Sequence, residues 1–341
     1  MAELKSITIA GGGLAGLSLG LGLRRHGVPV VVREAGRYPR HRVCGEFISG
    51  LRDPVIEALG MDGVFDDALS LRSTSWYVRD RRVLRASLPE PARSISRFRL
   101  DSRLGELLRR HGGELVEGSR VKAAGEEGLV WCAGRRLNKD SEWLGLKAHV
   151  SGYRPDDELE MHAGSGAYLG ITPVEDGYVN VCGLFRRRPG LRGTGPALMM
   201  AYLRESGLDQ LAGALESATV REGSFSGVSA ISFGRQPRPA DACALGDAEW
   251  MIPPFTGNGM TMAFESAEVA LPHLLRFSAG EAGWRAALDA IHAGLRRRFK
   301  DRMRIANTLH PFLYTRPGQM ALSLASKTHL LPFKLLYRTL R

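Results

Sequence analysis

The sequence predicts an α/β fold that combines a parallel sheet, a separate antiparallel sheet and a group of C-terminal helices. Three observations predict it: a strand, a glycine-rich turn and a helix open the chain, strand-like segments fill its middle, and arginine-rich helical segments end it. With 341 residues, 44% of them hydrophobic, the chain can bury two substantial cores. Four cysteines without CxxC spacing argue against a disulfide framework or a zinc site, and they favour a cytoplasmic protein.

The opening segment carries no charge from residue 6 to residue 23, but it is rich in glycine. Because glycine weakens a helix, we expect a β-α-β unit here and not a membrane span or a signal peptide. Residues 5–10 are predicted as a strand, residues 14–26 as a helix that ends in cations and a glycine, and residues 28–32 as a buried parallel strand.

The turn between the first strand and the helix contains Gly11, Gly13 and Gly16, and Glu34 follows the second strand. Gly11 allows a tight turn, Gly13 lets the backbone approach a pyrophosphate, and Gly16 lets the helix pack closely on the strand. A carboxylate at Glu34 can accept hydrogen bonds from a ribose and disfavours a 2′-phosphate. The unit therefore predicts a site for an adenine dinucleotide.

A second strand-and-turn unit near residue 245 distinguishes between the dinucleotides. Residues 242–245 form a short apolar strand that ends at Gly246 and Asp247, and a helical stretch over residues 261–277 follows a turn. An acid at a strand end can bond a polyol, and free N–H groups at a helix start suit an anionic ring. A ribityl chain and a reduced flavin need both, so FAD is favoured over NAD. The turn contains Pro254, Gly257, Asn258, Gly259 and Met260.

These residues together resemble the FAD-dependent superfamily of p-hydroxybenzoate hydroxylase-like monooxygenases and geranylgeranyl reductases, over about residues 5–276. Residues 39–49 (PRHRVCGEFIS) resemble the Cys-Gly-Glu region of the geranylgeranyl reductase branch, and Ser96, Arg97, Leu100 and Asp101 resemble the FAD-contacting arginine motif. The resemblance implies that Glu34 holds the adenosine ribose and that Arg42 and Arg97 lie near the pyrophosphate. It further implies that Asp247 binds the ribityl hydroxyls and that the N–H groups of Gly259 and Met260 face the flavin.

The resemblance also implies a domain organisation. We expect a discontinuous, Rossmann-like FAD-binding domain over residues 1–70, 96–142 and 235–280. An interleaved antiparallel substrate domain would occupy residues 71–95 and 143–234, and a basic helical region residues 281–341.

One departure from the family concerns the electron donor. Ala133 and Gly134 stand where the family usually has an Asp-Gly pair associated with binding of pyridine nucleotide. The reductant is therefore left open between NAD(P)H and a reduced carrier supplied by an electron-donor protein.

Three residues are candidates for catalysis: Cys44, Tyr168 and His149. Cys44 would lie beside the flavin and donate a proton, have its pKa lowered by cations, or simply fill a buried space. His149 shares one strand face with Lys147, and that face points either into the substrate cavity or to solvent. Glu46 would anchor the loop or cap a helix, and the other three cysteines are expected in the core.

The motifs favour flavin-mediated C=C reduction of a hydrophobic isoprenoid, lipidic or polyketide-like substrate. Hydroxylation of an aromatic or polyketide-like substrate is the alternative, and an electron-transfer flavoprotein without turnover of a small molecule is a second one. The chain lacks the Trp-x-Trp-x-Ile-Pro signature of flavin halogenases, and no motif indicates binding of nucleic acid. The sequence leaves the oligomeric state open.

The positive charge is concentrated at the end of the chain. Residues 295–341 contain eleven cations and one acid, which accounts for +10 of the formal net charge of +11. A basic, apolar C-terminal surface would collect a carrier-bound or membrane-presented substrate, at the periphery of a membrane. The alternative is a solvated arginine-rich helix followed by packing helices.

Overall fold

A five-stranded parallel sheet forms the centre of the first half of the fold. The computed structural model describes residues 3–122, 125–328, 330 and 332–340. The strands are β1 (Ile7–Ala10), β2 (Val30–Glu34), β6 (Glu114–Glu117), β7 (Leu129–Trp131) and β15 (Cys243–Ala244), in the order β15-β7-β1-β2-β6. All four pairings are parallel. Their mostly apolar sequences fit strands that are covered on both faces.

Helices cover this sheet and bury its apolar residues. Helix α1 (Leu14–Arg25) is buried continuously from Leu14 to Leu23, so it lies inside the core as an all-round apolar helix should. It packs against α3 (Arg97–Arg110) and α6 (Gly259–Ser278), and α6 in turn packs against α7 (Trp284–Leu309) and the short α2 (Asp53–Ala58). The predicted helix over residues 14–26 is thus found within one residue of its expected end.

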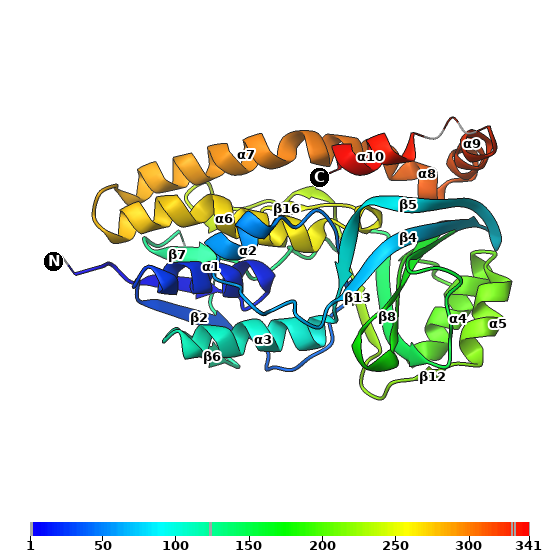
Figure 1. Ribbon diagram of the computed structural model, residues 1–341, viewed down its shortest axis with the longest axis horizontal. Coiled ribbons are helices and arrows are strands. Elements are labelled where there is room, and N and C mark those ends of the chain that lie inside the picture. Colours follow the sequence, from blue (N-terminus) through cyan, green and yellow to red (C-terminus); the bar gives the residue numbers. More distant parts are fainter. Residues whose placement is uncertain (1–2, 123–124, 329, 331, 341) are drawn as a thin grey trace.

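A nine-stranded, mainly antiparallel sheet forms the second half (Figure 1). Its order is β12-β8-β11-β10-β9-β4-β5-β3, and β13 pairs with β8. Only the β4–β9 pairing is parallel. The strands are β3 (Phe47–Ile48), β4 (Leu69–Val78), β5 (Arg81–Ser94), β8 (Trp143–Ser151), β9 (Glu160–Gly164), β10 (Ala167–Pro173), β11 (Val179–Arg186), β12 (Thr219–Val220) and β13 (Ser226–Ser229).

The two faces of the large sheet have different neighbours. Helices α4 (Gly195–Glu205) and α5 (Asp209–Glu216), which the sequence did not predict, cover one face and bury its aliphatic residues. The opposite face looks toward the parallel sheet. Because side chains alternate along each strand, every second residue of β8, β10 and β11 points to that side.

The C-terminal helices cover the edge where the two halves meet. Helix α7 runs along α6, and α8 (Pro311–Tyr314), α9 (Arg316–Lys327) and α10 (Phe333–Thr339) gather near β5 (Figure 1). A small antiparallel sheet of β14 (Gly234–Arg235) and β16 (Trp250–Met251) precedes α6 in the chain. No helix within the described ranges has both the length and the apolar content needed to cross a bilayer.

His310, between α7 and α8, is surrounded by aromatic rings. Its ring centroid lies 5.3 Å from that of Trp143, 5.0 Å from Phe233 and 4.9 Å from Tyr314, and Tyr168 and Phe255 lie within 6.0 Å. Only 7% of the residue is exposed. Burial, and to a smaller extent the charge of Arg186, lowers the pKa of His310 to about 4.

His310 should therefore make folding sensitive to mild acid. A histidine in the unfolded chain takes up a proton below about pH 6.5, whereas the folded protein resists protonation of His310 until about pH 4. The free energy of unfolding should fall by about 3 kcal/mol from this source as the pH drops through that window. In His310→Phe, denaturant unfolding between pH 7 and pH 4.5 should show a shallower pH dependence. The exposed His111 provides the control, since His111→Phe should retain the wild-type slope; equal slopes in all three proteins would contradict this account.

Candidate functional site

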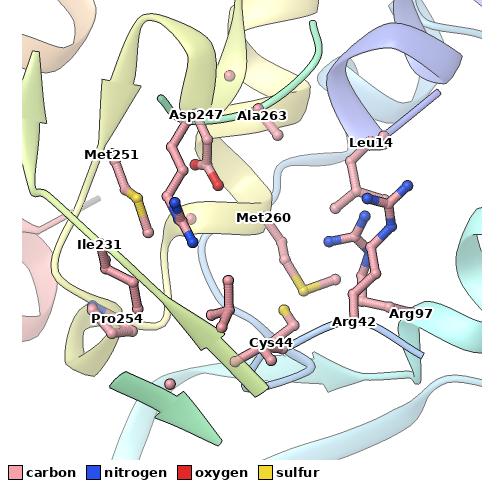
Figure 2. Close-up of a pocket in the computed structure, with 18 of the residues that line it drawn as sticks. Leu14, Arg42, Cys44, Arg97, Ile231, Asp247, Met251, Pro254, Met260 and Ala263 are labelled. Carbon is pink, nitrogen blue, oxygen red and sulfur yellow. The ribbon is translucent and has the colours of Figure 1, made fainter. Parts of the chain in front are cut away.

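A cavity of about 1250 Å³ lies between the parallel sheet and the antiparallel sheet (Figure 2). It opens at the carboxyl ends of β1, β2 and β7, where ligands bind in open α/β sheets. Most of the predicted site residues line it, while Gly16, Asn258 and His149 do not. The lining members of that set are Gly11, Gly13, Glu34, Arg42, Cys44, Arg97, Tyr168, Gly246, Asp247, Pro254, Gly257, Gly259 and Met260.

The glycines of the first turn have separate structural reasons. Gly11 has a φ of +108°, and a Cβ there would lie 2.4 Å from the carbonyl oxygen of Cys132. A Cβ on Gly16 would lie 2.0 Å from the carbonyl oxygen of Gly11. A Cβ on Gly13, by contrast, would meet nothing within 4 Å, and Gly13 lines the cavity. Gly13 therefore keeps open a space directly at the uncapped N-terminus of α1, which suits a pyrophosphate.

Glu34 is held at the end of β2 by backbone donors and by arginines. Its carboxylate accepts hydrogen bonds from the N–H groups of Gly12 and Gly36, both at 2.8 Å, and pairs with Arg40 at 2.6 Å and Arg42 at 3.5 Å. Burial alone would raise the pKa of Glu34, but the Gly36 hydrogen bond and the two arginines outweigh it and lower the pKa. A fixed, ionised acceptor at this position fits a ribose diol.

Two arginines at the same end of the cavity share one buried acid. Arg97 donates to both oxygens of Asp101, at 2.7 and 2.9 Å, and Arg42 donates to Asp101 at 2.9 Å. Asp101 is fully buried, and each arginine is held so that it still lines the cavity near Leu14 (Figure 2). The two cations fit a doubly charged pyrophosphate, and Asp101 positions them.

The opposite end of the site contains an acid and a helix start. Asp247, in the 3₁₀ turn η2 (Gly246–Ala248), projects toward the cavity without a hydrogen bond or ion pair to any described residue (Figure 2). Desolvation raises its pKa, while Arg97 and Arg135 act in the opposite direction. Helix α6 begins at Gly259 with no side-chain cap, which leaves the first N–H groups beside the cavity free. These groups fit a ribityl chain and an anionic ring.

A buried charge cluster in the cavity wall holds the segment that contains Cys44. The fully buried Glu46 contacts Lys147 at 3.2 Å and His149 at 2.6 Å, and it accepts a hydrogen bond from the N–H of Arg97 at 2.9 Å. Burial opposes ionisation, but the His149 hydrogen bond and the Lys147 charge lower the pKa of Glu46. Glu46 itself has a φ of +55°.

Lys147 and His149 consequently lie neither in the cavity nor in solvent. Their strand face does look toward the cavity, but residues 41–46 cover it: His41 lies 3.1 Å from Lys147, and Asn180 donates to the carbonyl of Cys44. Burial and Lys147 lower the pKa of His41 to about 4, so His41 is neutral and its Nδ1 accepts a hydrogen bond from Lys147. His149 and Lys147 thus anchor the cavity wall by holding the carboxylate of Glu46.

The part of the cavity nearest the antiparallel sheet is mainly apolar and aromatic. Burial raises the pKa of the Cys44 thiol and that of the Tyr168 hydroxyl, so both groups are protonated at neutral pH. Arg97 acts to lower the pKa of Cys44, but the opposite effect of burial is larger. Cys182, which the sequence placed in the core, also lines this part. Further lining residues are Met161, Leu184, Ile231, Phe233, Met251 and Phe255.

Several contributors escaped the sequence reasoning. Asp101 was quoted only as part of a motif, and Arg40, Arg135 and His310 were not singled out. Most of their contacts join residues that are distant in the chain, for example Asp101 with Arg42 and His310 with Trp143. The one local signal was the spacing of four between Arg97 and Asp101, which brings both to one helix face.

Paired glycine substitutions should separate a ligand site from a packing turn. Gly16→Ala should unfold or strongly destabilise the protein, because its Cβ meets backbone at 2.0 Å. Gly13→Ala should leave the melting temperature of the cofactor-free protein within a few degrees and weaken FAD binding at least tenfold, since its Cβ enters the space at the helix start. Thermal melting and fluorescence titration with FAD test this. Undiminished FAD binding by Gly13→Ala would exclude the proposed pyrophosphate position.

Removal of the Glu46 charge should destabilise the protein. Glu46→Gln leaves Lys147 buried without its anion, which should cost about 3–5 kcal/mol in the free energy of unfolding. Because the folded pKa of Glu46 is lowered, its contribution is present above the unfolded pKa and disappears as the pH falls through the folded value. Denaturant unfolding of Glu46→Gln, Lys147→Gln and the double variant measures the coupling. Additive effects in this cycle would show that the pair does not act as a unit.

No protein-family model and no curated protein matches the chain. Solved structures do match. PqsL of Pseudomonas aeruginosa, in complex with 2-aminobenzoylacetate, is 16% identical with a TM-score of 0.73, over 93% of this chain and 98% of PqsL. The flavin-dependent brominase Bmp2 is 17% identical with a TM-score of 0.77, over 98% and 92%. The myxobacterial chondrochloren halogenase CndH is 16% identical with a TM-score of 0.74, over 93% and 84%.

These likenesses confirm the predicted fold: a Rossmann-like parallel sheet, an antiparallel sheet and C-terminal helices, as in p-hydroxybenzoate hydroxylase-like FAD enzymes. PqsL is also described as a probable FAD-dependent monooxygenase. The three proteins are thus described as a monooxygenase, a brominase and a halogenase, and they lend no support to the geranylgeranyl reductase branch. The chain has the fold of flavin-dependent monooxygenases and halogenases.

Proposed function

We propose that this protein is an FAD-dependent oxidoreductase, and specifically a monooxygenase that hydroxylates an aromatic or polyketide-like substrate. One observation carries the FAD proposal: a single cavity joins the open space at Gly13 and the arginine pair to Asp247 and the free N-terminus of α6. Each end offers the chemistry that one half of FAD requires. Bound FAD would supply two-electron redox chemistry and, once reduced, activation of O₂.

The protein's own groups have distinct tasks in this proposal. Arg42 and Arg97 neutralise the pyrophosphate, Glu34 accepts from the adenosine ribose, and Asp247 accepts from the ribityl hydroxyls. The N–H groups of Gly259 and Met260 stabilise negative charge on the reduced ring. The apolar residues of the antiparallel sheet exclude water and orient the substrate, while the protonated Tyr168 and Cys44 are hydrogen-bond donors to it.

Hydroxylation is preferred to C=C reduction because the comparison structures include a probable monooxygenase and halogenases. The sequence had favoured reduction through the Cys-Gly-Glu motif, but the carboxylate of that glutamate is held by Lys147 and His149 and anchors the cavity wall. Halogenation is disfavoured by the missing Trp-x-Trp-x-Ile-Pro signature. An electron carrier without a substrate has no need of the apolar part of the cavity, around Met161, Ile231 and Phe233.

The reaction should depend on O₂. The purified protein, loaded with FAD and photoreduced without O₂, should hydroxylate a suitable phenol or polyketide only after O₂ is admitted, and isotopically labelled O₂ should place one labelled oxygen in the product. Anaerobic consumption of a lipidic alkene would show reduction instead. Rapid reoxidation by protein partners, with no small molecule converted, would show an electron carrier. A protein that takes up no FAD would contradict the whole proposal.

NAD(P)H and a reduced carrier protein are the two candidate electron donors. In this proposal Ala133 favours the carrier, because the family usually has an aspartate at this position. Anaerobic mixing of the FAD-loaded protein with NADPH or NADH, followed through the visible absorption of the flavin, distinguishes them. Slow bleaching by both nucleotides and fast bleaching by a reduced carrier protein is the expected result.

A further inference from the structure

The large apolar side chains that the described residues expose are concentrated in the last three helices and the loop between them. Seven are exposed, and five of these lie between residues 312 and 335; the other two are Leu69 and Leu137. The five are Phe312 (41% exposed), Met320 (73%), Leu324 (64%), Leu330 (76%) and Leu335 (62%). Together with the exposed cations Arg316, Lys327, Lys334 and Arg338 they form what we name the C-terminal patch.

Helix α9 presents two different faces. Gln319, Leu322 and Ser326 are buried, and this face rests on the antiparallel sheet, where Gln319 donates to the carbonyl of Gly164. The outward face carries Met320 and Leu324, four residues apart, with Arg316 one turn before them and Lys327 one turn after. An apolar stripe bounded by cations is typical of a helix that lies in a membrane interface.

Helix α10 repeats this arrangement on a smaller scale. Phe333 and Tyr337 pack inward on a cluster that contains Leu71 and Leu88. The outward side carries Leu335 between Lys334 and Arg338. Figure 1 shows α8, α9 and α10 along the same edge of the molecule, above β5, so their outer faces can meet one surface.

The C-terminal segment itself carries charge of one sign. No acid occurs in the sequence after Asp301, whereas Arg316, Lys327, Lys334 and Arg338 are exposed. Of the α7 cations, Arg298 and Arg302 pair with Glu265 of α6 and Arg304 pairs with Asp301, whereas Arg296, Arg297 and Lys300 are exposed. The cations of α9 and α10 differ from these in lying beside exposed apolar side chains.

We propose that the C-terminal patch docks the protein on an anionic lipid surface. Exposed Met and Leu side chains can enter the acyl boundary, while the flanking lysines and arginines stay at the level of anionic headgroups. Exposed cations on two helices that carry no acid of their own complement such a surface, and each cation contributes to binding. The docking itself does not depend on the flavin chemistry proposed above.

The docked helices also touch the substrate end of the cavity. Leu313 of α8 and Leu322 of α9 belong to one apolar cluster with Met161, Tyr168 and Leu184, and the last three line the cavity. The same short helices thus have the lipid surface on one side and the cavity wall on the other. This placement suits a substrate that is dissolved in, or presented at, the lipid surface.

Vesicle sedimentation tests the docking. The full-length protein should sediment at low salt with vesicles of equal parts phosphatidylcholine and phosphatidylglycerol, and much less with pure phosphatidylcholine. Replacement of Arg316, Lys327, Lys334 and Arg338 together by Gln should weaken binding on the order of 100-fold or more. Met320→Ser with Leu324→Ser should weaken it about tenfold or more. Melting temperatures verify that the variants fold.

Matched controls make the result specific. Gln at the exposed Arg52, Arg110, Lys139 and Arg192 removes the same charge elsewhere, and Leu137→Ser removes one equally exposed leucine; both should bind nearly as the wild type does. Absent binding at low salt, equal binding to neutral vesicles, or an equal loss in the controls would overturn the proposal. Binding to soluble polyglutamate without binding to vesicles would overturn it in favour of an acidic protein. Because FAD is not involved in the measurement, failure here is distinct from failure of the monooxygenase proposal.

Discussion

The buried carboxylate of Glu46 is the interaction on which the arrangement of the site depends. A charge at 0% exposure is tolerated only when it is paired, and the Glu46 carboxylate has three partners on two elements: the N–H at the start of α3, and Lys147 and His149 on β8. The carbonyl of the same residue accepts from Ser94 and Ile95. Removing any one partner would leave a buried charge or donor unmatched, so the wall that carries Cys44 is fixed relative to both sheets.

The same principle orders the dinucleotide end. Asp101 is completely buried and holds two arginines, while Glu34 holds Arg40 and is reached by Arg42. Arg42 thus connects the end of β2, where we propose that the ribose binds, with the helix that carries Arg97. A ligand with a ribose and two phosphates can engage all of these groups without moving any of them, which lowers the cost of ordering side chains on binding.

Local signals made the fold and the grouping of Gly13 and Glu34 at one end of the cavity predictable from sequence, whereas pairing between distant residues could not be predicted from it. Gly16 is required by a contact within its own β-α-β unit, and the start of α6 follows from its own turn, whereas the contact that requires Gly11 is with the distant Cys132. Lys147 and His149 were placed on one strand face by alternation, but alternation cannot tell which segment covers that face. Residues 41–46, about a hundred positions away in the chain, cover that face. For the same reason the Cys-Gly-Glu motif suggested flavin-mediated C=C reduction, whereas its glutamate anchors the cavity wall.

The positive net charge is a second case in which the structure refines what the sequence indicates. The sequence located nearly all of it in the last 47 residues, but burial divides those residues into two groups. Arg298 and Arg302 turn inward and stabilise the contact between α6 and α7, since Glu265 is itself buried and needs cations. The cations of α9 and α10 face outward beside leucines that the fold leaves uncovered, although leucine gains free energy when it is buried. An isolated exposed leucine requires no explanation. Here five exposed apolar side chains lie within 24 residues, cations flank them, and the cavity wall lies on the inner side of the same helices. This arrangement indicates that the edge contacts another apolar phase.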